Sequence, residues 1–297
     1  MTSGELVSFW TSDDVRLDGF VVDRRSARHG GGMKSATILY LHGKGGNFYS
    51  GPGRFMTELC ADERLVHFAV NMRCHDLGYT TPEAERPASG GPSARGGMWE
   101  HTADGALDIA AALAFAKGWE TDLTVLVGHS SGGFYAPLYL AEHTDSSLSA
   151  LVLLSPLMSG RTPFPRWFPT EEEEREALGT ARQAVARGEG HRVIALPEWY
   201  YAISAESLLE RADEPDHLWR DALMRVTVPV LVLWGDRESR GPVWDSVCKE
   251  HPGEVAGQIE RVAVHGAEHE YSGHEGLVCD AITHFVGQLL DGRPLGS

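Results

Sequence analysis

The chain has 297 residues, 42% of them hydrophobic, and a formal net charge of −16, so it can bury a large core but is poorly suited to bind nucleic acid or an anionic membrane. No apolar run reaches the length of a membrane span, and the N-terminus has no basic region followed by an apolar block, so no secretion signal is predicted. Four widely separated cysteines without CxxC spacing favour reduced thiols and a cytoplasmic location: Cys60, Cys74, Cys248 and Cys279.

The first third of the chain predicts an edge pair of strands and then buried strands. Residues 6–11 and 15–22 flank a short polar turn, and the second run alternates polar and apolar side chains, which predicts an antiparallel pair. The continuous apolar runs at residues 36–41 and 66–70 are typical of strands buried on both faces. Helices are predicted at residues 55–60 and 102–117.

A glycine-rich loop, His42-Gly43-Lys44-Gly45-Gly46, follows the first buried strand. Glycines let a reacting group approach the bare backbone, and acyl transfer needs backbone N–H donors for the developing oxyanion. The loop therefore predicts the Lys44 N–H as one donor and places Gly43 among the substrate contacts. An ordinary turn between a strand and a helix has the same composition, so this prediction depends on the next motif.

The residues that decide the chemistry come directly after the apolar run 123–127. The motif GHSSG occupies residues 128–132, and a predicted helix follows it. A strand that turns straight into a helix needs glycines beside its apex, and the apex side chain then points out at the helix N-terminus, where negative charge is stabilised. We therefore predict Ser130 as a nucleophile, the Ser131 N–H as the second oxyanion donor and His129 as a substrate contact.

Residues 157–227 interrupt the alternation of strands and helices. They lie between the strands predicted at residues 148–154 and 228–233, contain no strong strand of their own, and begin one helix with a capping box at Thr170. The predicted division of the chain is a core part at residues 1–156, a helical cap insertion at 157–227 and a second core part at 228–297.

Aromatic side chains are frequent in this insertion. We predict that Trp167, Trp199 and Tyr200 contact substrate, and that most of the other aromatic residues anchor the insertion to the core. An insertion at this point leaves the carboxyl edge of the sheet, where Ser130 is also expected. It is therefore predicted to cover the site and to favour apolar or aromatic groups.

Polar loops follow the last two predicted strands. The strand at residues 228–233 leads into GDRE at 235–238, and the strand at 259–264 leads into GAEH at 266–269. Both loops are expected at the same sheet edge as Ser130. The remaining helices are predicted at residues 242–251 and 277–290.

With these motifs in hand, the chain resembles the serine hydrolases and esterases of the α/β-hydrolase fold superfamily. The resemblance rests on an HG loop, the GHSSG turn, GDRE and GAEH, in the order nucleophile, acid, histidine. It covers essentially the whole chain outside the insertion. It implies an α/β fold with a mostly parallel central sheet of about eight strands, helices on both faces and a helical cap. The insertion is also similar to that of a group of hydrolases that includes fungal siderophore esterases.

The resemblance assigns the nucleophile to Ser130 and the general base to His269. The family's acid commonly stands in a Gly-x-x-Asp pattern, and here Glu238 occupies that last position. The departure from Asp leaves Asp236, two residues earlier, as the alternative acid. Other histidines, His265 and His274 among them, are weaker candidates for the base.

These assignments predict a serine hydrolase that cleaves the carboxylic ester of a small, apolar or aromatic molecule through an acyl-enzyme intermediate. The same residues would also serve amide or thioester hydrolysis, acyl transfer, perhydrolysis or C–C cleavage, and the fold can also serve as a non-catalytic small-molecule receptor. The expected partner is a small-molecule substrate, without a metal or an organic cofactor. The sequence does not indicate an oligomeric state.

Overall fold

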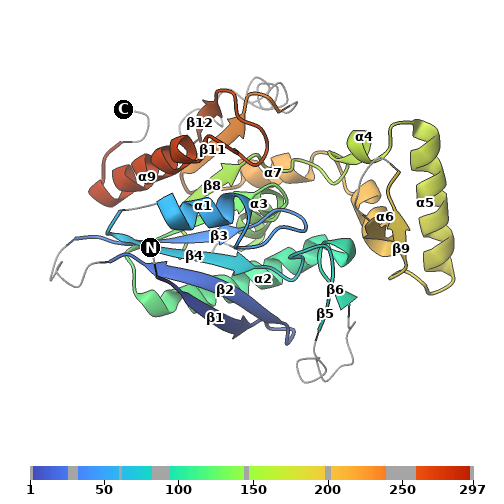
Figure 1. Ribbon diagram of the computed structural model, residues 1–297, viewed down its shortest axis with the longest axis horizontal. Helices are drawn as coiled ribbons and strands as arrows, with labels where there is room; N and C mark the ends of the chain where they lie inside the picture. The colour runs from blue at the N-terminus through green and yellow to red at the C-terminus, as the bar shows by residue number, and fades with distance from the viewer. Residues whose placement is uncertain are drawn as a thin grey trace.

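The computed structural model describes residues 3–25, 33–59, 62–81, 94–143, 147–197, 202–238 and 259–294. An eight-stranded sheet forms its centre, in the order β1-β2-β4-β3-β7-β8-β11-β12 (Figure 1). The strands of this sheet are β1 Glu5–Trp10, β2 Arg16–Asp23, β3 Ala36–Leu41, β4 Leu65–Asn71, β7 Leu123–His129, β8 Ala150–Leu154, β11 Val230–Gly235 and β12 Ile259–Val264. The helices that pack against it are α1 Gly51–Leu59, α2 Thr102–Ala116, α3 Gly132–Glu142, α7 Leu218–Met224 and α9 Glu275–Asp291.

The predicted fold class is confirmed. β1 and β2 pair antiparallel at one edge, β2 pairs antiparallel with β4, and all the remaining neighbours are parallel. Parallel order brings the carboxyl ends of β3, β7, β8, β11 and β12 to one edge of the sheet. The loops that carry the predicted site residues all leave from that edge.

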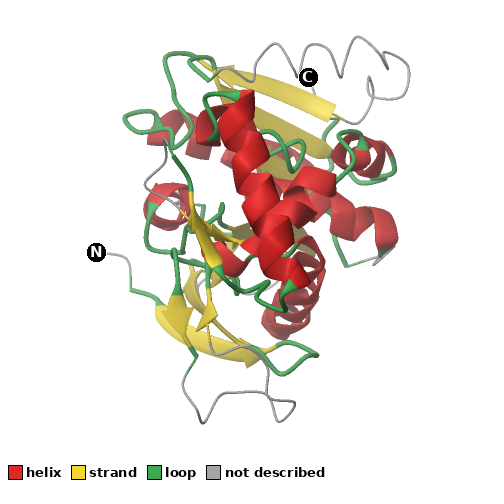
Figure 2. Ribbon diagram, turned by 90° about the vertical axis from the view of Figure 1, so that its right-hand side faces the viewer, coloured by secondary structure: helices red, strands yellow, loops and turns green. Residues whose placement is uncertain are grey.

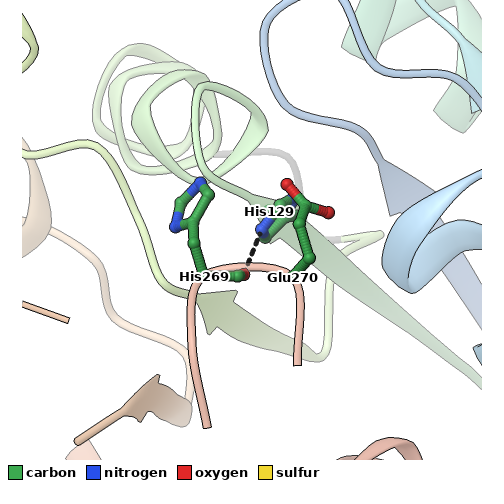
Figure 3. A group of neighbouring side chains, drawn as sticks. All are labelled: His129, His269 and Glu270. Carbon is green, nitrogen blue, oxygen red and sulfur yellow. Dashed lines mark hydrogen bonds between the residues drawn. The ribbon is translucent and has the colours of Figure 1, made fainter. Parts of the chain in front are cut away.

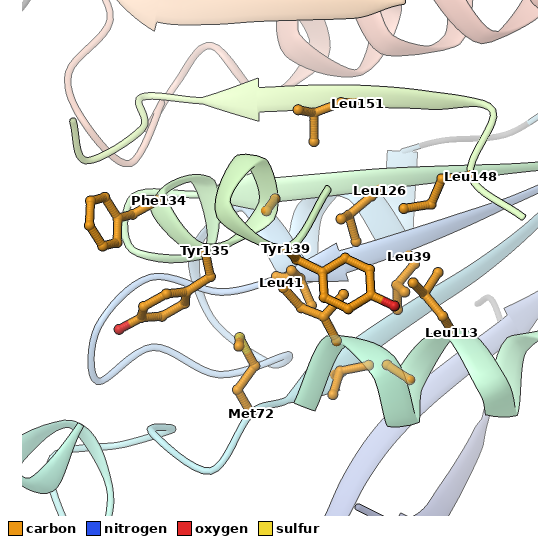
Figure 4. Packing of buried hydrophobic residues seen from close by; sticks show 14 of the residues in the cluster. Leu39, Leu41, Met72, Leu113, Leu126, Phe134, Tyr135, Tyr139, Leu148 and Leu151 are labelled. Atoms are coloured by element: carbon orange, nitrogen blue, oxygen red, sulfur yellow. The ribbon is translucent and has the colours of Figure 1, made fainter. Parts of the chain in front are cut away.

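Helices cover the inner parallel strands on both faces, which explains why strands such as β3 and β8 are buried along their whole length and almost entirely apolar. Along β3, Leu39 and Leu41 pack in a cluster with residues of α2 and α3 (Figure 4). Ile38 and Tyr40, which point the other way, pack in a second cluster with residues of α1 and α9. No strand of this kind has a face left for polar side chains.

The segment 157–227 connects β8 to β11 and forms its own small cluster of buried apolar residues. Its further elements are α4 Phe164–Trp167, α5 Glu171–Ala186, β9 Val193–Ala195, β10 Ala202–Ser204 and α6 Ala205–Asp213. α4, α5, α6 and β9 lie beyond the sheet on the right of Figure 1, and in the turned view of Figure 2 helices lie in front of the strands. The predicted capping box at Thr170 is present.

The segment was predicted to contain no strong strand, and it contains two short ones. β9 and β10 form a two-stranded antiparallel ladder that pairs Ile203 with Ile194. Each strand has only three residues, which is too short to show an alternating pattern in the sequence. The chain after β4 likewise contains a short ladder, between β5 Tyr79–Thr80 and β6 Ala94–Arg95.

A hydrogen bond to α3 joins the segment 157–227 to the core, at a carbonyl that a proline leaves without its helical donor. Pro137 lies inside α3, which continues past it to Glu142. Proline has no N–H, so the carbonyl of Gly133, four residues earlier, lacks its usual helical donor. The indole Nε1–H of Trp219 in α7 donates to that carbonyl at 2.9 Å. The missing helical hydrogen bond is thus replaced by one from the segment.

Two further predictions concern a helix near the C-terminal part of the chain and membrane spans. The helix predicted at residues 242–251 lies outside the described residues. Among the helices of the described part of the chain, none is both long and apolar enough to span a bilayer.

Candidate active site

Ser130 stands at the apex of the turn between β7 and α3 with a positive φ of 52°. Few residues other than glycine adopt this conformation, which costs about 1–3 kcal/mol. A Cβ added at Gly128 would lie 2.5 Å from the Gly132 carbonyl oxygen, and one added at Gly132 would lie 2.5 Å from the Leu41 oxygen. Side chains are therefore excluded at both glycines, as the motif predicted.

Backbone hydrogen bonds hold Ser130 in this strained conformation. Its N–H donates to Leu154 O at 3.0 Å, and its carbonyl accepts from Phe134 N at 3.1 Å and from Leu157 N at 2.8 Å. Leu154 ends β8 and Leu157 begins the segment 157–227. The turn is therefore fixed against the neighbouring strand and against the first residue of that segment.

Two backbone regions frame the Ser130 side chain. Ser131 precedes the first turn of α3, and its N–H has no acceptor among the described residues. Gly43 lies on the other side, where an added Cβ would stand 2.8 Å from Ser130 Cβ and 3.4 Å from Ser130 Oγ. The structure thus brings the predicted glycine-rich loop directly against the predicted nucleophile.

His42 fixes the peptide that joins Gly43 to Lys44. Met72 N–H donates to His42 Nε2 at 2.9 Å, so the proton of the neutral ring must be on Nδ1, which donates to Gly43 O at 2.7 Å. Burial lowers the pKa of His42 to about 4 and keeps the ring neutral. Gly46 N–H also donates to Gly43 O, at 2.9 Å. Since C=O and N–H point in opposite directions across a trans peptide, these bonds also orient the Lys44 N–H.

His269 and Glu238 form the pair expected of a base and its acid. His269 Nδ1 lies 3.0 Å from Glu238 Oε2, and the Glu238 side chain is 6% exposed. Burial alone would raise the pKa of Glu238, but hydrogen bonds from His269, Ser155 and the Gly235 N–H lower it to about 2. An ionised Glu238 can only accept, so Nδ1 carries the imidazole proton and Nε2 keeps the lone pair that a general base needs.

The alternative acid, Asp236, faces elsewhere. Its carboxylate accepts from Gly266 N–H at 2.7 Å and lies 2.6 Å from Nδ1 of His265, whose side chain is almost fully exposed. These contacts shape the loop that leads to His269 without reaching the His269 ring. The geometry therefore favours Glu238 over Asp236.

His129, predicted as a substrate contact, is buried next to His269. Its Nε2 donates to the backbone carbonyl of His269 at 3.0 Å, and the two ring centroids are 4.7 Å apart (Figure 3). Burial lowers the pKa of His129 to about 4. The contact positions the His269 loop beside the nucleophile turn, and the predicted contact with substrate stays a prediction.

No hydrogen bond joins the Ser130 hydroxyl to His269, both of which belong to the described residues. In enzymes without substrate such bonds are often long and tighten only when substrate binds. Among the described residues, one group of potential metal ligands lies close together: the ligand atoms of His129, His269 and Glu270 are within 4.8 Å of one another (Figure 3). Both imidazoles already make the hydrogen bonds given above, so a metal would have to displace them.

The predicted substrate-binding aromatics lie partly outside the description. Trp199 and Tyr200 are outside the described residues. Trp167 is 4% exposed, packs on Phe164 at a centroid distance of 5.6 Å, and has the Lys44 ammonium 5.9 Å from its ring centroid. It therefore packs within the segment 157–227, next to the glycine-rich loop, and its predicted contact with substrate stays a prediction.

Sequence reasoning did not identify two groups that support Glu238. Ser155 donates its hydroxyl proton to Glu238 Oε1, and the buried Tyr271 hydroxyl lies 2.7 Å from Ser155 Oγ. The available signal was that Ser155 directly follows β8, the strand next to β7, and that Tyr271 follows His269 by two residues. Both positions lie at the sheet edge where the site was expected.

The comparisons with known proteins agree with this architecture. A model of the Alpha/beta hydrolase family matches residues 38–280. No curated protein sequence is significantly similar to the chain. Solved structures share the fold at low sequence identity. One is Est1E from Butyrivibrio proteoclasticus, with 16% identity and a TM-score of 0.61 over 96% of this chain and 98% of that one.

Two other structures show the same likeness. The peroxisomal alpha-beta-hydrolase Lpx1 from Saccharomyces cerevisiae is 16% identical, with a TM-score of 0.59 over 99% of this chain and 91% of that one. The esterase Pf2001 from Pyrococcus furiosus is 17% identical, with a TM-score of 0.60 over 98% and 93%. The family model covers most of the chain, and the eight-stranded sheet has the strand pairing described above. The chain therefore belongs to the α/β hydrolase family.

Proposed function

We propose that this chain is a serine hydrolase that cleaves a carboxylic ester of a small molecule. Ser130 is the nucleophile, His269 the general base and Glu238 the acid that orients it, and the N–H groups of Ser131 and Lys44 bind the oxyanion. The observation that carries the proposal is the His269–Glu238 pair, 3.0 Å apart, on the same sheet edge as a serine held at positive φ.

The acylation step follows from the protonation states. As Ser130 Oγ attacks the acyl carbon, its proton passes to His269 Nε2, while Nδ1–H stays bonded to Glu238. The tetrahedral oxyanion accepts from the N–H groups of Ser131 and Lys44, and each such donor typically contributes ~10²–10³ in rate. The ester C–O bond then breaks, and the leaving alcohol takes the proton from His269.

Deacylation repeats this sequence with water. A water molecule attacks the acyl-enzyme while His269 takes one of its protons, and the second tetrahedral intermediate uses the same two N–H donors. When it collapses, the proton returns to Ser130 Oγ and the acid leaves. The ionised Glu238 stabilises the imidazolium that forms in both steps and does not itself take up a proton.

We further propose that the segment 157–227 is a cap over this site that selects apolar or aromatic esters. It begins three residues after the end of β8, at the sheet edge where Ser130 stands, and its Trp167 lies beside Lys44. Large rings offer ~150–250 Å² each for burial against substrate. The solved structure of Est1E with ferulic acid bound is 17% identical, so it shows the fold alone, but it suggests aromatic acyl groups for a first screen.

The test is covalent labelling with a fluorophosphonate, followed by a panel of esters of increasing acyl length that includes feruloyl and other aromatic esters. We expect one label on Ser130, and we expect Ser130→Ala to abolish both labelling and turnover. Asp236→Asn is the control, because it changes a carboxylate in the same loop as Glu238, and this variant should be labelled normally. A label on a different serine, or turnover that survives in Ser130→Ala, would overturn the assignment.

A further inference from the structure

A second buried carboxylate, Glu100, lies behind the glycine-rich loop. It follows the short helix η2 (Gly97–Trp99), directly precedes His101 and α2, and its side chain is 2% exposed. Its Oε2 accepts from Lys44 Nζ at 3.0 Å and from Arg211 Nη2 at 2.5 Å, and its Oε1 accepts from the Tyr135 hydroxyl. All three donors are side chains, and each comes from a different element.

These three elements are the ones that frame the candidate site. Lys44 belongs to the loop whose backbone touches Ser130. Tyr135 belongs to α3, the helix that follows Ser130, and Figure 4 shows its hydroxyl pointing away from the apolar cluster in which its ring is packed. Arg211 belongs to α6 of the segment 157–227. One carboxylate therefore joins the loop, the nucleophile helix and the segment.

The charges at this point require Glu100 to be ionised. Burial alone would raise the pKa of Glu100, but the charges of Lys44 and Arg211 and the hydrogen bond from Tyr135 lower it to about 2. Buried ion pairs add little net stability compared with apolar residues of similar size, so stability alone is a weak reason to keep one. Their geometry, in contrast, is well defined, because each partner has few alternatives inside the protein.

The geometry acts on the peptide that supplies the oxyanion donor. The turn backbone around Lys44 is held on either side: Gly43 O accepts from His42 and Gly46, and Gly45 N–H donates to Cys74 O at 3.3 Å. Glu100 holds Lys44 itself, through its side chain. A shift of this residue would rotate the N–H that is proposed to bind the oxyanion, and rate is sensitive to such small displacements.

We infer that Glu100 is a positioning residue of the proposed reaction, which holds Lys44 so that its N–H is aligned on the oxyanion. The inference rests on the proposed function. Glu100 touches neither Ser130 nor His269, so it acts through Lys44. Because Tyr135 and Arg211 share the same carboxylate, the alignment also depends on α3 and α6 keeping their places.

The experiment compares Glu100→Gln, Lys44→Met and the double variant, with an ester that the wild-type chain hydrolyses and with active sites counted by fluorophosphonate. We expect each single change to lower kcat by about 10- to 100-fold, a part of the ~10²–10³-fold cost of losing an oxyanion donor. KM should stay within about threefold, since the interaction is made in the transition state. The double variant should be no slower than the slower single variant, because both changes remove the same alignment.

Glu210→Gln is the matched control. Glu210 lies on α6 next to Arg211 and, like Glu100, joins α6 to the start of α2. It accepts from Thr102 N–H at 2.7 Å and contacts His101, but it does not touch Lys44. We expect its kcat to stay within about twofold of wild type. A kcat loss in this variant equal to that of Glu100→Gln would mean that the contact between α2 and α6 matters, and that Lys44 does not.

A misfolded variant, a failure of the proposed hydrolase function and a failure of the Glu100 role give different results. If Glu100→Gln does not fold, Lys44→Met decides alone, since it leaves Glu100 paired with Arg211 and Tyr135. Multiplicative kcat losses in the double variant, or losses confined to KM, would refute the positioning role. If wild-type Ser130 is not labelled at all, the proposed function fails instead. Normal labelling of Ser130 with unchanged kcat in both single variants would refute only the role of Glu100.

Discussion

Glu238 and Glu100 are two buried carboxylates with similar surroundings and different capabilities. Both have a pKa lowered to about 2, and both accept from three groups. The partner of Glu238 is the imidazole of His269, which can donate from one ring nitrogen to the carboxylate while the other nitrogen accepts a proton. The partners of Glu100 include a guanidinium, which never accepts a proton. The same carboxylate chemistry can therefore assist proton transfer at one place and only maintain geometry at the other.

The largest expected effect is on kcat when Glu238 is changed, because only this carboxylate is proposed to assist proton transfer. Glu238→Gln removes the negative charge that stabilises the imidazolium and allows the wrong His269 tautomer, so kcat should fall by about 10³–10⁴-fold. Asp236→Asn should cost less than about fivefold, because Asp236 contacts His265 and Gly266. Initial rates on one ester check both. The opposite order would make Asp236 the acid and remove Glu238 from the comparison.

A pH profile tests the Glu100 side of the comparison. Burial lowers the pKa of Lys44 to about 8. The negative charge of Glu100 opposes this shift, and the positive charge of Arg211 adds to it. Above that pH Lys44 loses its proton and its ion pair with Glu100 weakens, so kcat should decline on the alkaline side.

Lys44→Arg keeps a charge at every accessible pH. Its ratio of kcat at about pH 9 to kcat at about pH 7 should exceed the wild-type ratio by roughly two- to fivefold. Equal ratios for the two proteins would show that protonation of Lys44 does not affect the reaction. The ion pair with Glu100 would then be structural only.

The smallest expected effect comes from an uncharged contact that, like the Glu100 cluster, joins α3 to the segment 157–227. Trp219→Phe removes the indole N–H that serves the Gly133 carbonyl and should cost about 1–2 kcal/mol of unfolding free energy, with little effect on kcat. In a Pro137→Ala background the cost should shrink, because residue 137 can then donate to Gly133 itself. Denaturant unfolding of the four proteins measures the difference. Equal costs in both backgrounds would mean that the helix cannot close the gap.

Much of the sheet could be predicted from the sequence because buried parallel strands have no polar face. The run at residues 36–41 coincides with β3, which is buried along its whole length. The predicted range 259–264 also coincides with β12, although this is an edge strand that carries Glu260 and Arg261. The strands β9 and β10 could not be predicted, since three residues carry no period and their pairing is a tertiary contact. Element ends were less well predicted: the helix expected at residues 55–60 is α1, which already begins at Gly51.

The candidate site divides in the same way. Ser130, His269 and Glu238 are predictable because each follows a strand within a short motif, and strand ends converge. Glu100 is an ordinary acidic residue in the sequence, and its partners Lys44 and Arg211 are far from it along the chain. Only the packing of three elements reveals their meeting. Roles that depend on long-range contacts of this kind leave no local pattern.

The positive φ of Ser130 sets stability and catalysis against each other at one position. Glycine would adopt the same backbone without strain, so Ser130→Gly should raise the melting temperature while removing the reactive hydroxyl. A library randomised at this position and sorted for heat resistance alone would move away from serine. The same library sorted for ester turnover would return to it, so the two sorts together would show how much thermal tolerance this chain gives up to keep its nucleophile.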